Sequence, residues 1–265
     1  MVLVHGFTDT WRTWELVLPA LEERFDVLAP TLAGHAGGPP LPDGFDGEEL
    51  IDALEASLDA AGIATAHVVG NSLGGYAALR LAERGRARSV VALAPGGGWV
   101  EGDPSVVRTM EFFRGVHSLV LQAAPHADAV MATPEGRRRA TEFTTVRFEH
   151  LPPALLADQL RGAAQCLTVP LIDHGLRHGW PLDPARITCP VRIVWGHEDR
   201  ILPWPAAAAR YREWLPSADW VELEGVGHCP QLDDPARTVE LVLEFVDQGA
   251  GTMRIQGRGS SQPSG

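Results

Sequence analysis

The stretch that most constrains this chain covers residues 66–81, where an apolar segment enters the turn Gly-Asn-Ser-Leu-Gly at residues 70–74 and a helix-forming segment follows. The short apolar run, the glycines and the residues after them predict a buried strand, an abrupt turn and a buried helix. Gly70 and Gly74 lack the β-carbons that would collide where a strand reverses so quickly into a helix. The turn therefore presents Ser72 at its tip.

The pattern G-x-S-x-G between a strand and a helix is typical of a nucleophile elbow, in which an exposed serine hydroxyl attacks its substrate. A glycine turn that contains a serine by chance is the alternative, because five-residue motifs recur by accident. The start of the following helix offers unpaired backbone N–H groups and the positive end of a dipole. We therefore expect Ser72 to be a nucleophile and the N–H of Leu73 to stabilise an oxyanion.

A second turn follows the apolar residues 2–4 near the start of the chain. A strand that ends in His-Gly and an aromatic residue is typical of serine hydrolases that place their other oxyanion donor there, so the backbone N–H of Phe7 is the candidate. We expect His5 to be a buried structural histidine rather than a base, because such a turn needs a hydrogen-bonding side chain.

Two further predicted strands end near the residue types that a serine nucleophile requires: residues 191–195 precede Asp199, and residues 220–223 precede His228. The carboxyl ends of parallel strands meet at one edge of a sheet, where α/β folds bind ligands. There His228 would accept the serine proton and Asp199 would hold the imidazole. The carboxylates that compete for the place of Asp199 are Asp173, Asp183, Glu198 and Glu224.

Charge and cysteine content limit the partners of this chain. Its 34 acidic and 22 basic residues give a net charge of −12, which argues against nucleic acid or an anionic membrane as partner and favours a small molecule. No apolar run approaches the roughly 18 residues of a membrane span, and the first residues do not resemble a signal peptide. Three scattered cysteines favour a reducing cytoplasm. No cofactor is expected, and the histidines match no metal-ligand pattern.

The sequence pattern changes between residues 99 and 186, where helix-like runs replace strand-like ones. We expect residues 1–98 and 187–248 to form an α/β core, residues 99–186 a helical insertion, and the Gly- and Ser-rich residues 249–265 a disordered tail. Trp99 and Trp204 are candidates for binding an apolar substrate. Such aromatic residues are more often simply part of a core.

These segments together resemble the α/β-hydrolase superfamily, with nucleophile, acid and histidine in that order along the chain. The resemblance covers nearly the whole chain apart from the tail, and it rests on the elbow at residues 70–74, the turn at 5–7, the acid loop at 196–199 and the histidine loop at 227–230. It implies a mostly parallel sheet flanked by helices. It also implies a helical cap inserted after the strand at residues 89–94.

One feature departs from the pattern of that family. The family usually has two strands before the strand that carries the oxyanion turn, whereas here that strand begins at residue 2. Either the sheet is shortened, which leaves a strand at residues 25–29 on an edge that needs cover, or the natural chain begins upstream.

The resemblance implies a serine hydrolase that cleaves a carboxylic ester or a lactone of a small, largely apolar substrate through an acyl-enzyme. One alternative is hydrolytic carbon–carbon cleavage of a vinylogous diketone, because relatives with that activity share the cap position and a glycine-rich turn similar to residues 95–98. The other is a non-catalytic protein that binds a small ligand on this fold. A serine nucleophile disfavours dehalogenase and epoxide-hydrolase chemistry, because relatives with those activities use a carboxylate in its place.

Overall fold

The sheet of the computed structural model, which describes residues 1–45, 47–100 and 102–256, runs parallel through five strands in the order of the sequence. The strands are β1 (Val2–Val4), β2 (Ala66–Asn71), β3 (Ala87–Leu93), β4 (Val191–Gly196) and β5 (Asp219–Leu223). Each pair of neighbours is parallel, so the loops that follow the strands gather at one edge. The predicted α/β class with a parallel sheet is confirmed.

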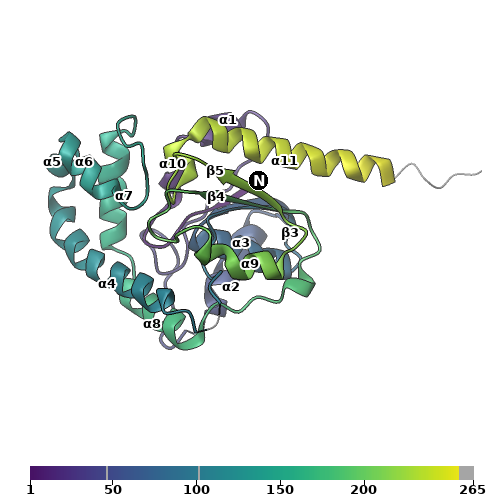
Figure 1. Cartoon of the computed structure of the whole chain (residues 1–265), viewed down its shortest axis with the longest axis horizontal. Helices are drawn as coiled ribbons and strands as arrows, with labels where there is room; N and C mark the ends of the chain where they lie inside the picture. The colour runs from purple at the N-terminus through teal and green to yellow at the C-terminus, as the bar shows by residue number, and fades with distance from the viewer. Residues whose placement is uncertain (46, 101, 257–265) are drawn as a thin grey trace, which may run out of the picture.

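Helices cover both faces of this sheet (Figure 1). On one face lie α1 (Leu18–Glu22) and α11 (Pro235–Gln256), and on the other lie α2 (Glu48–Ala60), α3 (Leu73–Glu83) and α9 (Ala209–Trp214). Successive strand residues point to opposite faces. In β3, Val90 and Ala92 accordingly pack in the core that contains α2 and α3, while Val91 and Leu93 pack in the core that contains α11.

Five α-helices lie between β3 and β4 in the described part of this segment and extend to one side of the sheet (Figure 1). They are α4 (Ser105–Ala123), α5 (Ala127–Met131), α6 (Pro134–Thr141), α7 (Pro153–Ala164) and α8 (Thr168–His178). We call this segment the helical insertion. Met110 of α4 and Ile172 of α8 belong to the same hydrophobic core as the sheet. In the part of the chain that the structure describes, every helix is too short or too polar to span a membrane.

Two expectations from the sequence need correction. The predicted strand at residues 25–29 is reduced to a single parallel bridge between Leu28 and Val2, and Pro30 behind it has no N–H with which to continue the ladder. The tail expected to be disordered from residue 249 is helical as far as Gln256, because α11 continues to that residue. A helix that has already nucleated extends at little cost in free energy. Residues 257–265 lie outside the described residues.

Candidate active site

Ser72 occupies a sharp turn between β2 and α3. Its φ of 55° and ψ of −118° are unusual for a residue with a side chain, and such strain is concentrated at functional sites. A β-carbon on Gly74 would lie 2.1 Å from the carbonyl oxygen of Val4, and one on Gly70 would lie 2.1 Å from the carbonyl oxygen of Gly74. Gly70 is therefore required for the turn to close on itself, and Gly74 for the turn to pack against β1.

His228 and Asp199 meet in the interior. The His228 Nδ1 lies 2.7 Å from the Asp199 Oδ2, and both side chains are buried. The other carboxylate oxygen accepts the backbone N–H groups of Ile201 and Leu202 at 2.9 and 2.8 Å, which fixes the orientation of the carboxylate. Because an ionised carboxylate only accepts hydrogen bonds, Nδ1 is the donor and Nε2 is the acceptor of the ring. This is the tautomer that can take up a proton at Nε2.

Asn71, the residue before Ser72, joins the elbow to the histidine loop. Its Nδ2 donates to the carbonyl oxygen of His228 at 2.9 Å and to that of Leu93 at 3.1 Å. Its Oδ1 accepts the side-chain amide of Gln231 at 3.1 Å. The structure therefore brings the segments that carry Ser72, Asp199 and His228 to the same edge of the sheet.

The candidate oxyanion donors flank the serine. Leu73 is the first residue of α3, and the first N–H groups of a helix have no partner within it. The turn that carries Phe7 lies against the elbow, because a β-carbon on Gly6 would be 3.3 Å from the Ser72 Cβ. Phe7 and Leu73 both line a pocket together with Ser72.

His5 holds the oxyanion turn in place. Its Nε2 accepts the N–H of Leu32 at 2.9 Å, so Nδ1 carries the proton and donates to the carbonyl oxygen of Gly6 at 2.8 Å. Burial lowers the pKa of His5 to about 3. The ring therefore stays neutral and acts as a fixed link between the turn and the loop at Leu32, as expected for a structural histidine.

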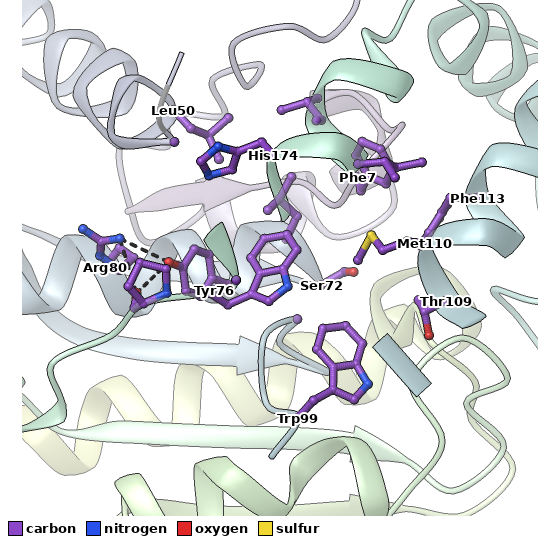
Figure 2. Close-up of a pocket in the computed structure, with 18 of the residues that line it drawn as sticks. Phe7, Leu50, Ser72, Tyr76, Arg80, Trp99, Thr109, Met110, Phe113 and His174 are labelled. Atoms are coloured by element: carbon purple, nitrogen blue, oxygen red, sulfur yellow. Dashed lines mark hydrogen bonds between the residues drawn. The ribbon is translucent and has the colours of Figure 1, made fainter. Parts of the chain in front are cut away.

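The pocket beside Ser72 has mostly apolar walls (Figure 2). It lies between the sheet edge and the helical insertion, which contributes Met110 and Phe113 from α4 and Ile172 from α8. Trp99 lines it as well. An acyl or aromatic group of a substrate would be buried against these side chains, which is the usual construction of a small-molecule site.

The opposite end of the pocket is polar but closed. Figure 2 shows Tyr76 and Arg80 there, joined by a hydrogen bond. The guanidinium of Arg80 binds both carboxylate oxygens of Glu48 at 2.7 and 2.9 Å, and its Nε lies 3.0 Å from Glu83. Its remaining terminal nitrogen donates to the Tyr76 hydroxyl and to the carbonyl oxygen of Pro181. Both terminal nitrogens of Arg80 are thus hydrogen-bonded within the protein, while its Nε is buried without a hydrogen-bond partner among the described residues.

Trp204 lies outside this pocket, contrary to the expectation that it binds substrate. Its ring packs against Trp195, Trp220 and His197, with centroids 5.9, 6.0 and 6.3 Å away. Ile201 and Leu202 line the pocket from the same loop. The chain turns away after Leu202, so the indole covers β4 and β5 instead.

The four carboxylates that compete with Asp199 for the place beside His228 have other partners. Asp173 pairs with Arg114, Asp183 accepts the N–H of Ala185, Glu198 accepts that of Val226, and Glu224 pairs with His197. No group of three or more potential metal ligands is found in the described part of the chain.

Two carboxyls near the site, the half-buried Asp9 and the buried Asp233, were not assigned a role there from the sequence. Asp9 follows the oxyanion turn and accepts the N–H of Thr10 and the side chain of Gln159 in α7. Burial raises the pKa of Asp9 to about 6. Asp233 follows the histidine and is the first of two adjacent aspartates. Asp234 caps α11 by accepting the N–H of Arg237, whereas Asp233 binds the histidine loop.

Comparison with known proteins identifies the family of this chain. A model described as "Alpha/beta hydrolase family" matches residues 1–241. The chain is 30% identical over 206 residues to "Epoxide hydrolase EphH" of Mycobacterium tuberculosis, covering 75% of this chain and 94% of that protein. It is 26% identical to "Pimeloyl-[acyl-carrier protein] methyl ester esterase" of Neisseria meningitidis, covering 92% of each.

Solved structures agree on the fold. An enol-lactonase from Burkholderia xenovorans superposes with a TM-score of 0.68 at 21% identity and covers 93% of this chain and 90% of that one. A bacterial membrane phospholipase A superposes with a TM-score of 0.73 at 24% identity and covers 94% of this chain and 78% of that one. At these identities the likeness shows the fold alone.

Proposed function

We propose that this chain, which belongs to the alpha/beta hydrolase family and is therefore a hydrolase, cleaves carboxylic esters or lactones of small, largely apolar substrates through a serine-bound acyl-enzyme. The observation that carries the proposal is the 2.7 Å hydrogen bond between the buried His228 and Asp199. It lies at the sheet edge where the elbow presents Ser72. A receptor would have no need to hold an imidazole in the tautomer of a base beside a strained serine.

The first half-reaction forms the acyl-enzyme. The Ser72 Oγ attacks the carbonyl carbon while its proton passes to the His228 Nε2, and Asp199 stabilises the imidazolium that results. The backbone N–H groups of Phe7 and Leu73 bind the oxyanion, each donor contributing on the order of 3 kcal/mol to the rate. The tetrahedral intermediate then expels the alcohol, which takes the proton from His228.

The second half-reaction releases the acid. A water molecule gives its proton to His228 as it attacks the acyl carbon, and a second oxyanion occupies the same two N–H groups. Collapse of this intermediate breaks the bond to the Ser72 Oγ, which regains its proton from the imidazolium. The carboxylic acid leaves and the enzyme is restored.

The lining of the pocket favours an uncharged substrate. Its closed end holds Arg80, whose terminal nitrogens already donate to Glu48, Tyr76 and Pro181 and whose charge is already paired with Glu48 and Glu83. A substrate carboxylate buried there would lose its hydration without gaining a cation, which is strongly unfavourable. This weighs against carbon–carbon cleavage of a dienoate, which is an anion, and for neutral esters and lactones.

The test is labelling with a fluorophosphonate probe followed by a substrate panel. Ser72→Ala should abolish labelling and turnover. The matched control is Ser89→Ala, since Ser89 is also buried and also lies beside a histidine, 2.9 Å from the His67 Nδ1; it should retain both. The panel contains p-nitrophenyl esters of increasing chain length, lactones, a dienoate diketone and an aryl epoxide. Turnover of the epoxide or the diketone alone, or no labelling of folded wild type, would overturn the proposal.

A further inference from the structure

The backbone around His228 is held from three directions. The N–H of Gly227 donates to the Asp233 Oδ2 at 2.6 Å, and the carbonyl oxygen of His228 accepts the Asn71 amide at 2.9 Å. The N–H of Cys229 donates to the carbonyl oxygen of Thr144 at 2.9 Å. Thr144 belongs to the loop between α6 and α7 of the helical insertion, so the Cys229 contact reaches that loop directly. The Gly227 contact reaches the same loop through Asp233.

Asp233 forms the larger part of this connection. It is only 2% exposed, and its Oδ1 accepts the N–H groups of Val146 and Arg147, each at 2.8 Å. One carboxylate thus binds the histidine loop with one oxygen and the insertion loop with the other. Because a carboxylate accepts at both oxygens and donates at neither when ionised, no other side chain of this length satisfies all three N–H groups.

The two loops are also in direct contact. A β-carbon on Gly227 would lie 3.1 Å from the carbonyl oxygen of Thr144 and 3.3 Å from the Thr145 Cα. The histidine loop therefore lies close against the backbone of residues 144 and 145. With Asp233 and Cys229 bound to the same segment, it cannot shift away without breaking hydrogen bonds.

We propose that Asp233 is a positioning residue that couples the docking of residues 144–147 to the placement of the His228 imidazole. The proposal rests on the serine-hydrolase function proposed above. The imidazole of His228 would be correctly placed relative to Ser72 and Asp199 only while residues 144–147 are docked. A displacement of about 1 Å at a reacting group lowers a rate by about 100-fold, so a bridge of this kind acts on the chemical step.

The test compares variants at the two ends of the bridge. Asp233→Asn keeps the shape of the side chain but replaces one oxygen by an NH2 group. That NH2 group would face a backbone N–H, so donor would meet donor. It should lower kcat by about 10-fold to 100-fold and leave KM within about twofold. Val146→Pro removes one N–H from the other end at a residue whose side chain is 43% exposed, and it should lower kcat in the same way. The double variant should be no worse than Asp233→Asn, because both changes break one connection.

Controls separate positioning from mere stabilisation. Asp233→Glu keeps two acceptors and should recover part of kcat. Arg147 lies on the same loop as Val146. Arg147→Gln breaks its 3.1 Å ion pair with Asp234 but keeps its backbone N–H, so it should leave kcat unchanged. The proton between His228 and Asp199 should give a far-downfield NMR signal that broadens in Asp233→Asn and in Val146→Pro.

The outcomes distinguish this proposal from the function on which it rests. Wild type is first labelled with the fluorophosphonate, and failure at that step refutes the function. If wild type reacts, unchanged kcat and an unchanged downfield signal in both variants, with only a lower melting temperature, would refute the positioning role. Should Asp233→Asn not fold, Val146→Pro and its downfield signal decide alone.

Discussion

Replacing Asn71 with aspartate should make the stability of this protein fall steeply as the pH rises. Asn71 is 1% exposed, and its Nδ2 faces the carbonyl oxygens of His228 and Leu93 at 2.9 and 3.1 Å. An aspartate of the same shape would place an acceptor, negative when ionised, against two other acceptors. In a buried site such a contact is relieved by taking up a proton.

Protonation of the new carboxyl limits the free energy of unfolding that Asn71→Asp can lose. The pKa of an unfolded aspartate is about 3.9, so holding a proton at pH 7 costs about 4 kcal/mol. The single O–H can donate to one of the two carbonyls, and the hydrogen bond that is lost adds about 1 kcal/mol. The deficit of Asn71→Asp at pH 7 should therefore approach about 5 kcal/mol, a large part of the free energy of unfolding of an ordinary domain.

The pH dependence has a definite sign. The pKa of the new carboxyl is raised in the folded state, so the folded state binds more protons than the unfolded state between about pH 4 and pH 7. The deficit relative to wild type should shrink by about 1.4 kcal/mol for each pH unit as the pH falls across that window.

Urea unfolding of wild type and variants at several pH values is the assay. Asn71→Ala is the matched control, because it removes the same hydrogen bonds without adding a titratable group, and its deficit should not vary with pH. A deficit of Asn71→Asp that is equally flat would mean that the side chain reaches water. The argument that Asn71 joins the elbow to His228 would then fail.

Other predictions follow from single contacts. A β-carbon on Gly196 would lie 2.2 Å from the carbonyl oxygen of Val226, so Gly196→Ala should displace the histidine loop by about 1 Å and lower kcat by about 100-fold; steady-state kinetics check this, and a wild-type kcat contradicts it. Burial lowers the pKa of His5 to about 3 and of His35 to about 4, so each should reduce the free energy of unfolding by about 1.4 kcal/mol per pH unit as the pH drops below their ordinary 6.5. Urea unfolding from pH 7 to pH 5 measures this, and a flat profile is the contrary result. Phe113→Ala should widen the pocket and move the kcat/KM optimum of the p-nitrophenyl series to a longer acyl chain; an unchanged optimum would place that chain elsewhere.

The apolar pattern predicted the five strands of the sheet, but it also predicted a strand at residues 25–29 where the structure has a single bridge. The strand β3 is visible in the sequence as a continuous apolar run, because a strand of a parallel sheet is buried on both faces, and Val90 and Val91 accordingly face different cores. The elbow was equally visible, since only glycine fits at Gly70 and Gly74. The predicted strand at residues 191–195, which ends four residues before it, then indicated Asp199 as the partner of His228.

The rest of the site depends on contacts that no local pattern encodes. Asp233 binds backbone N–H groups at Val146 and Arg147, 87 and 86 residues earlier in the chain. Any residue except proline supplies such a group, so the sequence holds no mark of the partner. Trp204 was misplaced for a related reason, because an aromatic residue near a site can equally pack on the outside of the sheet that carries the site.

The strands and the loops of the site should differ in how they tolerate substitutions. Burial of the apolar runs on both faces of the sheet fixes the strands but leaves the loops at their carboxyl ends free to take several positions. Three buried polar side chains, those of Asn71, Asp199 and Asp233, bind backbone groups of those loops. Since each buried group that loses its partner costs about 1–3 kcal/mol, these contacts penalise every other arrangement of the loops. Volume-conserving apolar substitutions in the sheet should therefore leave kcat intact, whereas isosteric polar substitutions at these three positions should lower it.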